Sequence, residues 1–473
     1  MVGIVAYGAY VPYYRLKKET VAQAFGKKAG KGSKAVAYCD EDSLTMAVAA
    51  ALDAVNGTNT DDIRALYFAS TTSPYAEKQA ATQVAAALDL GTKIRTADFA
   101  NTLRAGSSAM LAGCDTLAAA GAGKAMVTFS DCRLGAADGK FEDELGDAAA
   151  AFLLGTENLL ATIDATASVA KEAIDEWRAD DDRFVRFFDV RYASSLLYTP
   201  LVTEAVSELF AKTGLTAADY SKIVLYGHDD KNRGALAAKL GFAPEQVVPS
   251  YFKEIGNSGN AAAGLMLCKA LDDAKTGDRI LFVSYGEGAD AISLTVTEKA
   301  ASYKVPNSVE ALLAHKNDSL PYGKYLKWKG MIETEPQRRP PQERSALPDL
   351  YRNYKKNHAL YGSRCNECGT IVFPPQRICV HCGCVDNYEL YSLRDKVGTV
   401  RTFTADGLSV SLDSPNIVVD IECEGGGKLL TYLVDCKQED VYVGMKVKPT
   451  FRKLFEVNGV STYFWKVIPV QEV

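Results

Sequence analysis

The sequence lacks the features that direct a chain to a membrane or to nucleic acid. It has no run of about 18 apolar residues, the length that a membrane-spanning helix needs. The stretch Met1–Tyr10 holds no basic residue, whereas a secretory signal peptide opens with a basic segment. Long runs of basic residues are absent, and the formal net charge is -6, which argues against a nucleic-acid partner. These absences predict a cytoplasmic protein with neither a membrane nor a nucleic acid as partner.

Cysteine is present but unevenly spread. Of the 11 cysteines, five fall between Cys365 and Cys384, and the others are scattered. Such crowding is typical of a metal site in a reducing compartment rather than of a disulfide framework. The length of 473 residues predicts about three domains, each with enough material for a sizeable core.

Segments typical of strands and helices alternate in the first part of the chain. Apolar residues at helical spacing predict a helix from about Glu41 to Val55, which Asp42 or Ser43 can cap. The run Ala65–Ala69 predicts a strand, and a helix of small residues follows from about Gln79 to Leu88. This alternation predicts an α/β layer around a mainly parallel sheet.

Two charged stretches of this part are predicted to lie at the surface. The Lys-rich segment Lys17–Lys34 is interpreted as a surface helix followed by a loose loop. The segment Ala165–Asp189, which is rich in charge and carries several aromatic residues, is interpreted as a surface excursion.

Helices built almost entirely from small apolar residues occur twice, and each feeds a strand. Ala105–Gly123 precedes the strand Gly123–Asp131, and Asn260–Leu271 precedes the strand Gly277–Tyr285. A helix that is apolar all round is normally enclosed by other elements. The spacing of about 150 residues indicates an internal duplication, although two Rossmann-like units would give the same pattern. However, no G-x-G-x-x-G lies between a strand and a helix.

The last part of the chain carries a metal-binding pattern. Cys365-Asn-Glu-Cys368 and Cys379-Val-His-Cys382 form two CxxC pairs, each followed by Gly. Four thiolates suit tetrahedral zinc, and a closed site of this kind has no open position for catalysis. Iron, a disulfide, or a site that uses His381 or Cys384 are the alternatives. Short β-branched and aromatic runs then predict a small barrel, of the OB type, over residues 391–473.

The stretch Thr96–Met110 resembles the nucleophile turn of the thiolase superfamily, in which a Cys opens a buried helix. The likeness is strongest to the hydroxymethylglutaryl-CoA (HMG-CoA) synthases and the ketoacyl-ACP synthase III proteins. It extends to other short motifs, namely Tyr75-Ala-Glu-Lys, Ala97-Asp-Phe with Ala105-Gly, Gly146-Asp-Ala-Ala-Ala150, Lys239-Leu-Gly-Phe242, Ile255-Gly-Asn257 and Ser284-Tyr-Gly286. The C-terminal part is similar to the zinc-ribbon plus OB-fold proteins that accompany thiolase-like enzymes as separate subunits.

This resemblance implies a duplicated five-layer α-β-α-β-α fold, a homodimer and a tunnel for the pantetheine arm of coenzyme A. The domains are expected at residues 1–165 and 166–300 for the two thiolase-like halves. A linker with a short aromatic helix, Tyr322–Met331, and with the prolines Pro336, Pro340 and Pro341 is expected over 301–350. The zinc ribbon is expected over 351–390 and the OB-fold over 391–473.

The catalytic residues of the family are mostly missing at the matching positions. The family's Glu falls on Thr71, its Cys on Leu103 and its His on Tyr226, and only the Asn is kept, as Asn257. Leucine cannot accept an acyl group, so the usual covalent route is closed.

Neither nearby cysteine is expected to replace the missing nucleophile. Cys114 stands 11 residues further along the helix, a distance of about 16 Å. Cys132 follows a strand and is interpreted as a small buried hydrophobe.

The groups that remain can move a proton or stabilise an oxyanion. Tyr226, His228 and Glu287 are candidates for proton transfer, Asn257 and nearby backbone amides are candidate donors, and Thr71 occupies the position of the family's Glu. Each has a plainer interpretation, as core packing, a turn or a solvent-facing charge. The basic residues Arg104, Lys231 and Arg233 are expected either to bind the phosphates of coenzyme A or to be solvated.

A thiolase-like chain without its Cys, joined to a zinc-ribbon/OB module, is similar to aldolases that cleave or form a β-hydroxyacyl-CoA. The leading hypothesis is therefore aldol or retro-aldol chemistry on a CoA thioester, with structural zinc and with a partner enzyme of the same pathway possible. The alternatives are an HMG-CoA synthase-like or ketoacyl synthase-like condensing enzyme and a non-catalytic acyl-CoA-binding scaffold for a partner enzyme.

Overall fold

The computed structural model describes residues 1–28, 30–335, 345–409 and 411–470, and it divides into two units. The first unit comprises Met1–Ala37, Asp42–Ala85 and Leu90–Tyr322, and the second comprises Tyr38–Glu41, Ala86–Asp89 and Gly323–Val473. The linker prolines Pro336, Pro340 and Pro341 lie outside the described residues. Each unit is described by itself below.

A nine-stranded sheet runs through the first unit, in the order β11-β12-β13-β8-β1-β7-β6-β4-β5. Its first-half strands are β1 (Gly3–Tyr10), β4 (Ile63–Ala69), β5 (Arg95–Phe99), β6 (Lys124–Cys132) and β7 (Asp147–Gly155). Its second-half strands are β8 (Ala161–Ala170), β11 (Lys222–Leu225), β12 (Arg279–Tyr285) and β13 (Gly288–Val296). The two groups meet where β1 pairs briefly with β8, Gly3 with Thr162 and Ile4 with Ala161.

The expected mainly parallel sheet is wrong. The pairs β4–β5, β4–β6 and β11–β12 are parallel, but β7 returns antiparallel between β1 and β6, and β13 returns antiparallel between β8 and β12. The physical reason is the short link between β12 and β13, since a tight hairpin joins only antiparallel strands.

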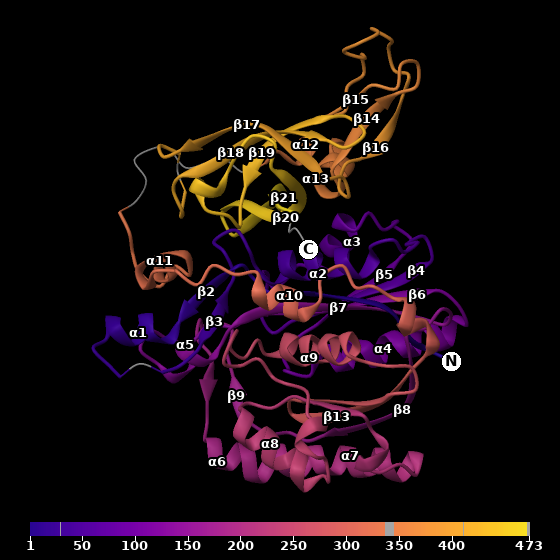
Figure 1. Ribbon diagram of the computed structural model, residues 1–473, viewed down its shortest axis with the longest axis vertical. Coiled ribbons are helices and arrows are strands. Elements are labelled where there is room, and N and C mark those ends of the chain that lie inside the picture. Colours follow the sequence, from indigo (N-terminus) through magenta and orange to yellow (C-terminus); the bar gives the residue numbers. More distant parts are fainter. Residues whose placement is uncertain (29, 336–344, 410, 471–473) are drawn as a thin grey trace. The chain divides into compact units, whose positions relative to one another are not determined.

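Helices cover the two strand groups and also separate them, as Figure 1 shows. On the outside, α2 (Ser43–Val55) packs on β1, β6 and β7, while α7 (Thr199–Thr213) packs on β8 and β13 and α8 (Asp230–Lys239) on β11. Between the groups, α4 (Ala105–Ala120) packs on β4 and β6, and α9 (Asn260–Asp272) packs on β7 and β11. The layers alternate α-β-α-β-α, which confirms the predicted thiolase-like fold.

The two central helices lie close to the neighbouring strands because glycine stands at the contacts. A Cβ at Gly106 of α4 would lie 2.0 Å from Phe129, and one at Gly264 of α9 would lie 2.8 Å from Ala150. The Asn260 side chain joins the helix starts, since its Oδ1 accepts from the Gly106 N–H at 2.7 Å and its Nδ2 donates to the Ala69 carbonyl at 2.8 Å. The enclosed position predicted for the small-residue helices is confirmed for α9, whereas α4 is enclosed only in its first part, because Ala118–Ala120 are exposed.

Both stretches interpreted as surface segments need correction. In Lys17–Lys34 the helix is present, but the loop ends in a strand from Ser33, and Lys34 is buried where its ammonium donates to the Glu142 carbonyl. In Ala165–Asp189 the first residues complete β8 inside the sheet, and Asp175 is buried. Trp177 does face solvent, at 38% exposure, so the excursion is real only in part.

The remaining elements of the first unit are short. They are β2 (Tyr14–Lys17), β3 (Ser33–Val36), β9 (Glu176–Trp177), β10 (Arg186–Phe187), α1 (Lys18–Ala24), α3 (Ala80–Ala87), α5 (Lys140–Glu144), α6 (Val190–Tyr192), a π-helical turn (Ala193–Tyr198), α10 (Val309–Ala314) and 3-10 turns at Ala217–Asp219, Pro244–Gln246 and Glu298–Ser302. Asp42 caps α2 through a capping box with Thr45, as predicted.

The second unit holds a zinc ribbon and a closed barrel. The helices that precede the ribbon are α11 (Tyr322–Trp328), α12 (Leu347–Arg352) and α13 (Tyr354–Ala359), and the ribbon strands are β14 (Tyr361–Cys365), β15 (Ile371–Val372) and β16 (Tyr388–Ser392). The barrel order is β17-β18-β19-β21-β20, formed by β17 (Gly398–Asp406), β18 (Asn416–Cys423), β19 (Lys428–Leu433), β20 (Lys446–Val457) and β21 (Val460–Pro469), with a 3-10 turn at Gln438–Asp440. Across the described ranges, no helix is both long and apolar enough to span a bilayer.

Candidate functional site

The turn that leads into α4 carries Leu103, the residue that the sequence resemblance aligns with the nucleophile of the thiolase superfamily. Leu103 is 7% exposed and packs in the core. The β12–β13 hairpin lies against this turn, because a Cβ at Gly286 would stand 2.9 Å from the backbone nitrogens of Leu103 and Arg104. Only glycine allows the two backbones to approach so closely. The hairpin and the turn therefore form one wall of the candidate site.

Glu287, at the tip of that hairpin, is bound to the same turn. The Thr102 hydroxyl donates to Glu287 Oε2 at 2.6 Å, and the residue is only partly buried. Burial raises the pKa of the Glu287 carboxyl, and the nearby charge of Asp175 adds to the effect while Thr102 opposes it. Glu287 also has a positive φ of 44° in the two-residue link between β12 and β13, a conformation that some types of tight turn require of a central residue.

Thr71, at the position of the family's Glu, is committed to a buried carboxylate. Its backbone N–H and its hydroxyl both donate to Asp131 Oδ1, at 2.7 and 2.9 Å. Asn260 N–H donates to the other oxygen, Asp131 Oδ2, at 2.8 Å. Burial raises the pKa of Asp131 although Arg133 and these donors oppose the shift.

Tyr226 and Asn257 are bound to each other. The Tyr226 hydroxyl donates to Asn257 Oδ1 at 3.2 Å, and that oxygen also accepts from the Gly259 N–H at 2.9 Å. Tyr226 has no exposed surface, and burial raises the pKa of its hydroxyl above the usual range. The strand ends at Leu225, so Tyr226 and His228 lie in the turn that follows it.

His228 lies between two carboxylates that the sequence did not reveal. Its Nε2 is 3.1 Å from Asp175 Oδ2, and its Nδ1 is 3.5 Å from Glu176 Oε1. Burial disfavours the charged imidazole, but Glu176 and Asp175 outweigh burial and raise the pKa of His228 to about 10. The ring is therefore a cation at neutral pH and has no lone pair with which to accept a proton.

Two more side chains complete this buried network. Arg133 Nη2 is 2.6 Å from Glu176 Oε2, and the Tyr285 hydroxyl donates to Asp175 Oδ2 at 2.6 Å. Burial tends to raise the pKa of Glu176, but Arg133 and His228 hold it at about 2. Asp175 and Glu176 belong to the stretch interpreted as an excursion, where nothing in the sequence distinguishes them from the solvated acids that follow.

The three basic residues expected to bind coenzyme A differ in their exposure and in the hydrogen bonds that they already make. Arg104 donates to the Gly286 carbonyl at 2.8 Å and pairs with Asp290 at 3.0 Å. Arg233 is buried and donates to the Val248 carbonyl at 2.7 Å. Lys231 is exposed near the start of α8, so it is the one of the three that a phosphate reaches without breaking a buried contact.

The four cysteines of the second unit converge as the spacing predicted. The sulfurs of Cys365, Cys368, Cys379 and Cys382 all lie within 4.8 Å of one another. The Cys365–Cys382 and Cys368–Cys379 sulfur pairs are 3.6 Å apart. Tetrahedral zinc with bonds of about 2.3 Å needs sulfurs about 3.8 Å apart, so the set fits the ion.

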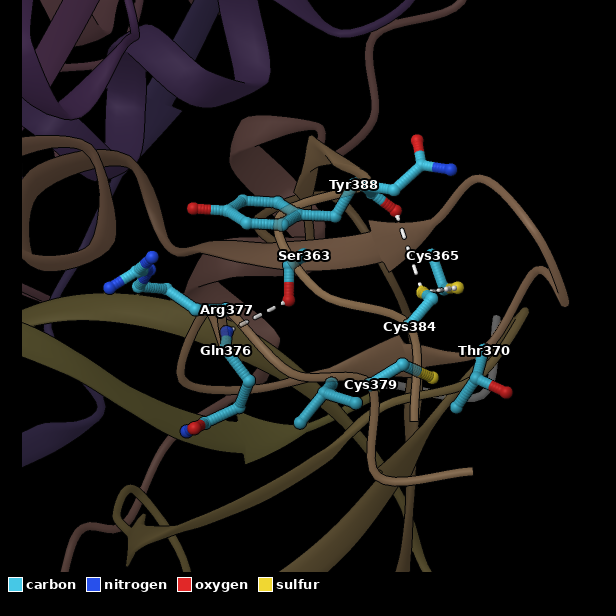
Figure 2. A pocket seen from close by; sticks show the side chains of 10 residues that line it. Ser363, Cys365, Thr370, Gln376, Arg377, Cys379, Cys384 and Tyr388 are labelled. Carbon is cyan, nitrogen blue, oxygen red and sulfur yellow. Dashed lines mark hydrogen bonds between the residues drawn. The ribbon is translucent and has the colours of Figure 1, made fainter. Parts of the chain in front are cut away.

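The rival ligand Cys384 lies at the edge of the same cluster. Figure 2 shows its sulfur beside that of Cys365, at 3.2 Å. Both residues line a shallow hollow together with Cys379 and Arg377. This hollow is the space beside a metal site, far in sequence from the residues of the first unit discussed above.

Family comparisons cover both units. The family described as ChsH2, rubredoxin-like zinc ribbon domain, matches residues 352–383, and the ChsH2, C-terminal OB-fold domain, matches residues 394–452. The 3-oxoacyl-[acyl-carrier-protein (ACP)] synthase III C terminal family matches residues 210–297. The predicted zinc ribbon and OB-fold are confirmed, and the ribbon match contains all four converging cysteines.

Full-length relatives identify the first part of the chain. The hydroxymethylglutaryl-CoA synthase of Methanopyrus kandleri is 35% identical over 345 residues, which cover 70% of this chain and 98% of that protein. The chain belongs to the hydroxymethylglutaryl-CoA synthase family. The Methanocaldococcus jannaschii member is 33% identical over 346 residues, covering 70% of this chain and 100% of its own. The family places the chain among the condensing enzymes of the thiolase superfamily.

Solved structures agree on the fold of this hydroxymethylglutaryl-CoA synthase homologue. MvaS in complex with 3-hydroxy-3-methylglutaryl coenzyme A matches with a TM-score of 0.63 at 23% identity, covering 72% of this chain and 94% of that chain. The curacin biosynthetic pathway HMG synthase in complex with acetyl donor-ACP matches with a TM-score of 0.61 at 20% identity, covering 69% and 88%. The two named relatives are covered over 98% and 100% of their length by 70% of this chain, which also carries the ribbon and barrel.

Proposed function

We propose that this chain makes or breaks the carbon-carbon bond of a β-hydroxyacyl-CoA by aldol chemistry, without an acylated cysteine. The observation that carries the proposal is Leu103, a buried apolar side chain at the turn where the family resemblance places the nucleophile. An aldol reaction needs a base for one proton and donors for an enolate, and it needs no covalent intermediate on the protein.

Glu287 is the proposed base. It is partly exposed, it adjoins the nucleophile turn through Thr102, and its raised pKa makes it a better proton acceptor than an ordinary surface carboxylate. His228 is less suited to this role because Asp175 and Glu176 keep it protonated. Tyr226 and Asn257 support the wall of the site through their mutual hydrogen bond.

The proposed cleavage balances without any further reagent. The Glu287 carboxylate takes the proton of the β-hydroxyl, the bond between the α and β carbons breaks, and a carbonyl product forms. The electron pair becomes the enolate of the thioester, and the proton held by Glu287 is then transferred to its α carbon, which restores the carboxylate. Backbone amides of the turn at Leu103, held against the Gly286 hairpin, are the proposed donors to the enolate oxygen. The same steps in reverse form the bond.

Coenzyme A, a homodimer and a partner enzyme belong to the same proposal. Relatives are named for hydroxymethylglutaryl-CoA, and one solved neighbour carries that coenzyme A ester. Lys231 is the proposed phosphate contact because it is exposed, whereas Arg104 and Arg233 hold buried carbonyls. One solved neighbour is a complex with an acetyl donor-ACP, which supports the proposal of a protein partner.

Mass spectrometry after incubation with short and aromatic β-hydroxyacyl-CoA and acyl-CoA thioesters tests the proposal. The expected result is cleavage or condensation with no change in protein mass, and loss of turnover in Glu287→Gln. Glu298→Gln, at an exposed position in a 3-10 turn, is the matched control and should keep turnover.

A covalent acyl adduct would contradict the proposal and favour the condensing reaction of the family, with another residue in place of Leu103. Tight binding of coenzyme A esters without turnover, whatever partner is added, would favour the scaffold alternative.

A further inference from the structure

Arg133, just after β6, holds a buried N–H without a partner. Its side chain is 4% exposed, and its Nη2 is 2.6 Å from Glu176 Oε2. Its Nη1 is buried and has no hydrogen-bond partner among the residues that the structure describes. A buried donor left unpaired destabilises a protein by about 1–3 kcal/mol, so such a group calls for an explanation outside the chain's own contacts.

The position of Arg133 connects this donor to the candidate site. A Cβ at Gly259 would lie 2.6 Å from Arg133 Cδ and 3.4 Å from Leu103 Cδ2. The Arg133 and Leu103 side chains therefore both lie near Gly259, where Asp131 Oδ2 also approaches the same point at 2.7 Å. The hydroxyl of Ser258, the residue before Gly259, is also buried and also has no hydrogen-bond partner in the described part of the chain.

The surrounding charges decide which kind of ligand atom fits. Arg133 and His228 are cations, while Asp131, Asp175 and Glu176 are carboxyl groups within the same buried network. An additional carboxylate would add negative charge to a cluster that already has more acids than bases. A neutral oxygen, such as a hydroxyl or a carbonyl, accepts a hydrogen bond from Arg133 Nη1 without adding negative charge to the cluster.

We infer that Nη1 of Arg133 binds the β-oxygen of the substrate's acyl chain beside Leu103. This inference rests on the proposed aldol function. It assigns Arg133 to the β-carbon, which becomes the carbonyl product when the bond is cleaved. As the carbon-carbon bond breaks, the β-oxygen loses its proton to Glu287 and gains negative charge before the carbonyl forms. A guanidinium N–H aimed at this oxygen stabilises the charge where it develops.

Isothermal titration calorimetry tests the assignment without requiring turnover. The probes are 3-hydroxybutyryl-CoA, butyryl-CoA and glutaryl-CoA, added to the full chain. A hydrogen bond to a charged group contributes about 1.5–3 kcal/mol, so wild type should bind the hydroxy compound about 10- to 100-fold more tightly than butyryl-CoA. Arg133→Lys keeps the charge beside Glu176 but loses the second nitrogen, and it should bind the two equally.

Arg15→Lys is the matched control. Arg15 is also a buried arginine whose Nη2 has no partner among the described residues, but it lies on β2, outside the nine-stranded sheet. This variant should keep the wild-type preference for the hydroxy compound, whatever the exchange does to stability.

The outcomes separate this inference from the proposed function. Equal binding of 3-hydroxybutyryl-CoA and butyryl-CoA by wild type overturns the inference even if cleavage is observed, and so does tighter binding of glutaryl-CoA. A preference that Arg133→Lys abolishes, without cleavage of any ester, supports the binding assignment while the aldol proposal fails. If Arg133→Lys does not fold, the wild-type comparison of the three esters still decides.

Discussion

At the level of single residues, His228 lies between Asp175 and Glu176, and this arrangement fixes its charge. Its pKa of about 10 in the folded chain is above the value of about 6.5 expected in the unfolded chain. The raised pKa means that its stabilising contribution is fully present below about pH 6.5 and declines as the pH rises toward 10. Glu176, with a pKa of about 2, shows the opposite behaviour and loses its contribution as the pH falls below about 4.5.

We therefore expect the free energy of unfolding of wild type to fall between pH 6.5 and pH 10 more steeply than that of His228→Gln. Urea unfolding at a series of pH values measures both slopes. Equal slopes in the two proteins would show that the carboxylates do not hold the proton on His228.

Two buried tyrosines beside this network offer a matched pair. The Tyr285 hydroxyl donates to Asp175 at 2.6 Å, whereas the Tyr198 hydroxyl has no partner in the described ranges. Tyr285→Phe should lower the free energy of unfolding by about 1–3 kcal/mol because it leaves a buried acceptor short of a donor, and Tyr198→Phe should leave it unchanged or raise it. Equilibrium unfolding in urea gives both values, and the reverse order would contradict the hydrogen-bond assignment.

At the level of elements, the packing of α4 on β6 and on the start of α9 depends on glycine. The Cβ of Gly106→Ala would stand 2.0 Å from Phe129 of β6 and 2.6 Å from Asn260 Oδ1, so α4 must move away from both. We expect the free energy of unfolding to fall by about 1–3 kcal/mol, as is typical of an overpacked core. Gly234→Ala in α8 is the control, because nothing lies within 4 Å of its Cβ and alanine favours a helix by about 0.5–1 kcal/mol. Thermal unfolding should show opposite shifts, and equal shifts would contradict the packing.

The elements that the sequence predicted well are those with a local signal. The start of α2 follows from Asp42 and its capping box, and α4 and α9 follow from runs of small residues that no exposed helix would carry. The antiparallel direction of β13 follows from its short link to β12, a local feature that the prediction of a mainly parallel sheet did not use. The direction of β7 was missed because its pairing with β1 joins segments distant in sequence.

In the candidate site, too, the residues with a local sequence signal were found and those that only the fold brings together were missed. The turn at Leu103 and the residues Tyr226, Asn257 and Glu287 are carried by motifs, and the structure places Glu287 at the turn and Tyr226 against Asn257. Asp175 and Glu176 were missed because only the fold brings them to His228 and Arg133. In the sequence they look like the exposed acids a few residues later.

At the level of the whole molecule, a thiolase-like unit and a metal-binding unit share one chain. The proposed reacting groups all belong to the first unit, and the four converging cysteines belong to the second. A closed site of four thiolates stabilises its own fold and offers no position to a substrate. Zinc is therefore expected to hold the ribbon together rather than to take part in the reaction.

Removing the zinc should thus affect the two units differently. We expect about one zinc per chain, and a chelator should increase hydrogen exchange in residues 361–392, which contain the ribbon strands, while the protection of the nine-stranded sheet is kept. Cys382→Ser should lose the metal, because Cys382 is one of the four converging ligands. Cys384→Ser is the matched control and should retain it, since that sulfur lies beside Cys365 without belonging to the set of four. If Cys384→Ser loses the zinc and Cys382→Ser retains it, Cys384 is the ligand and Cys382 is not. If the chelator also removes protection throughout the first unit, zinc stabilises more than the ribbon.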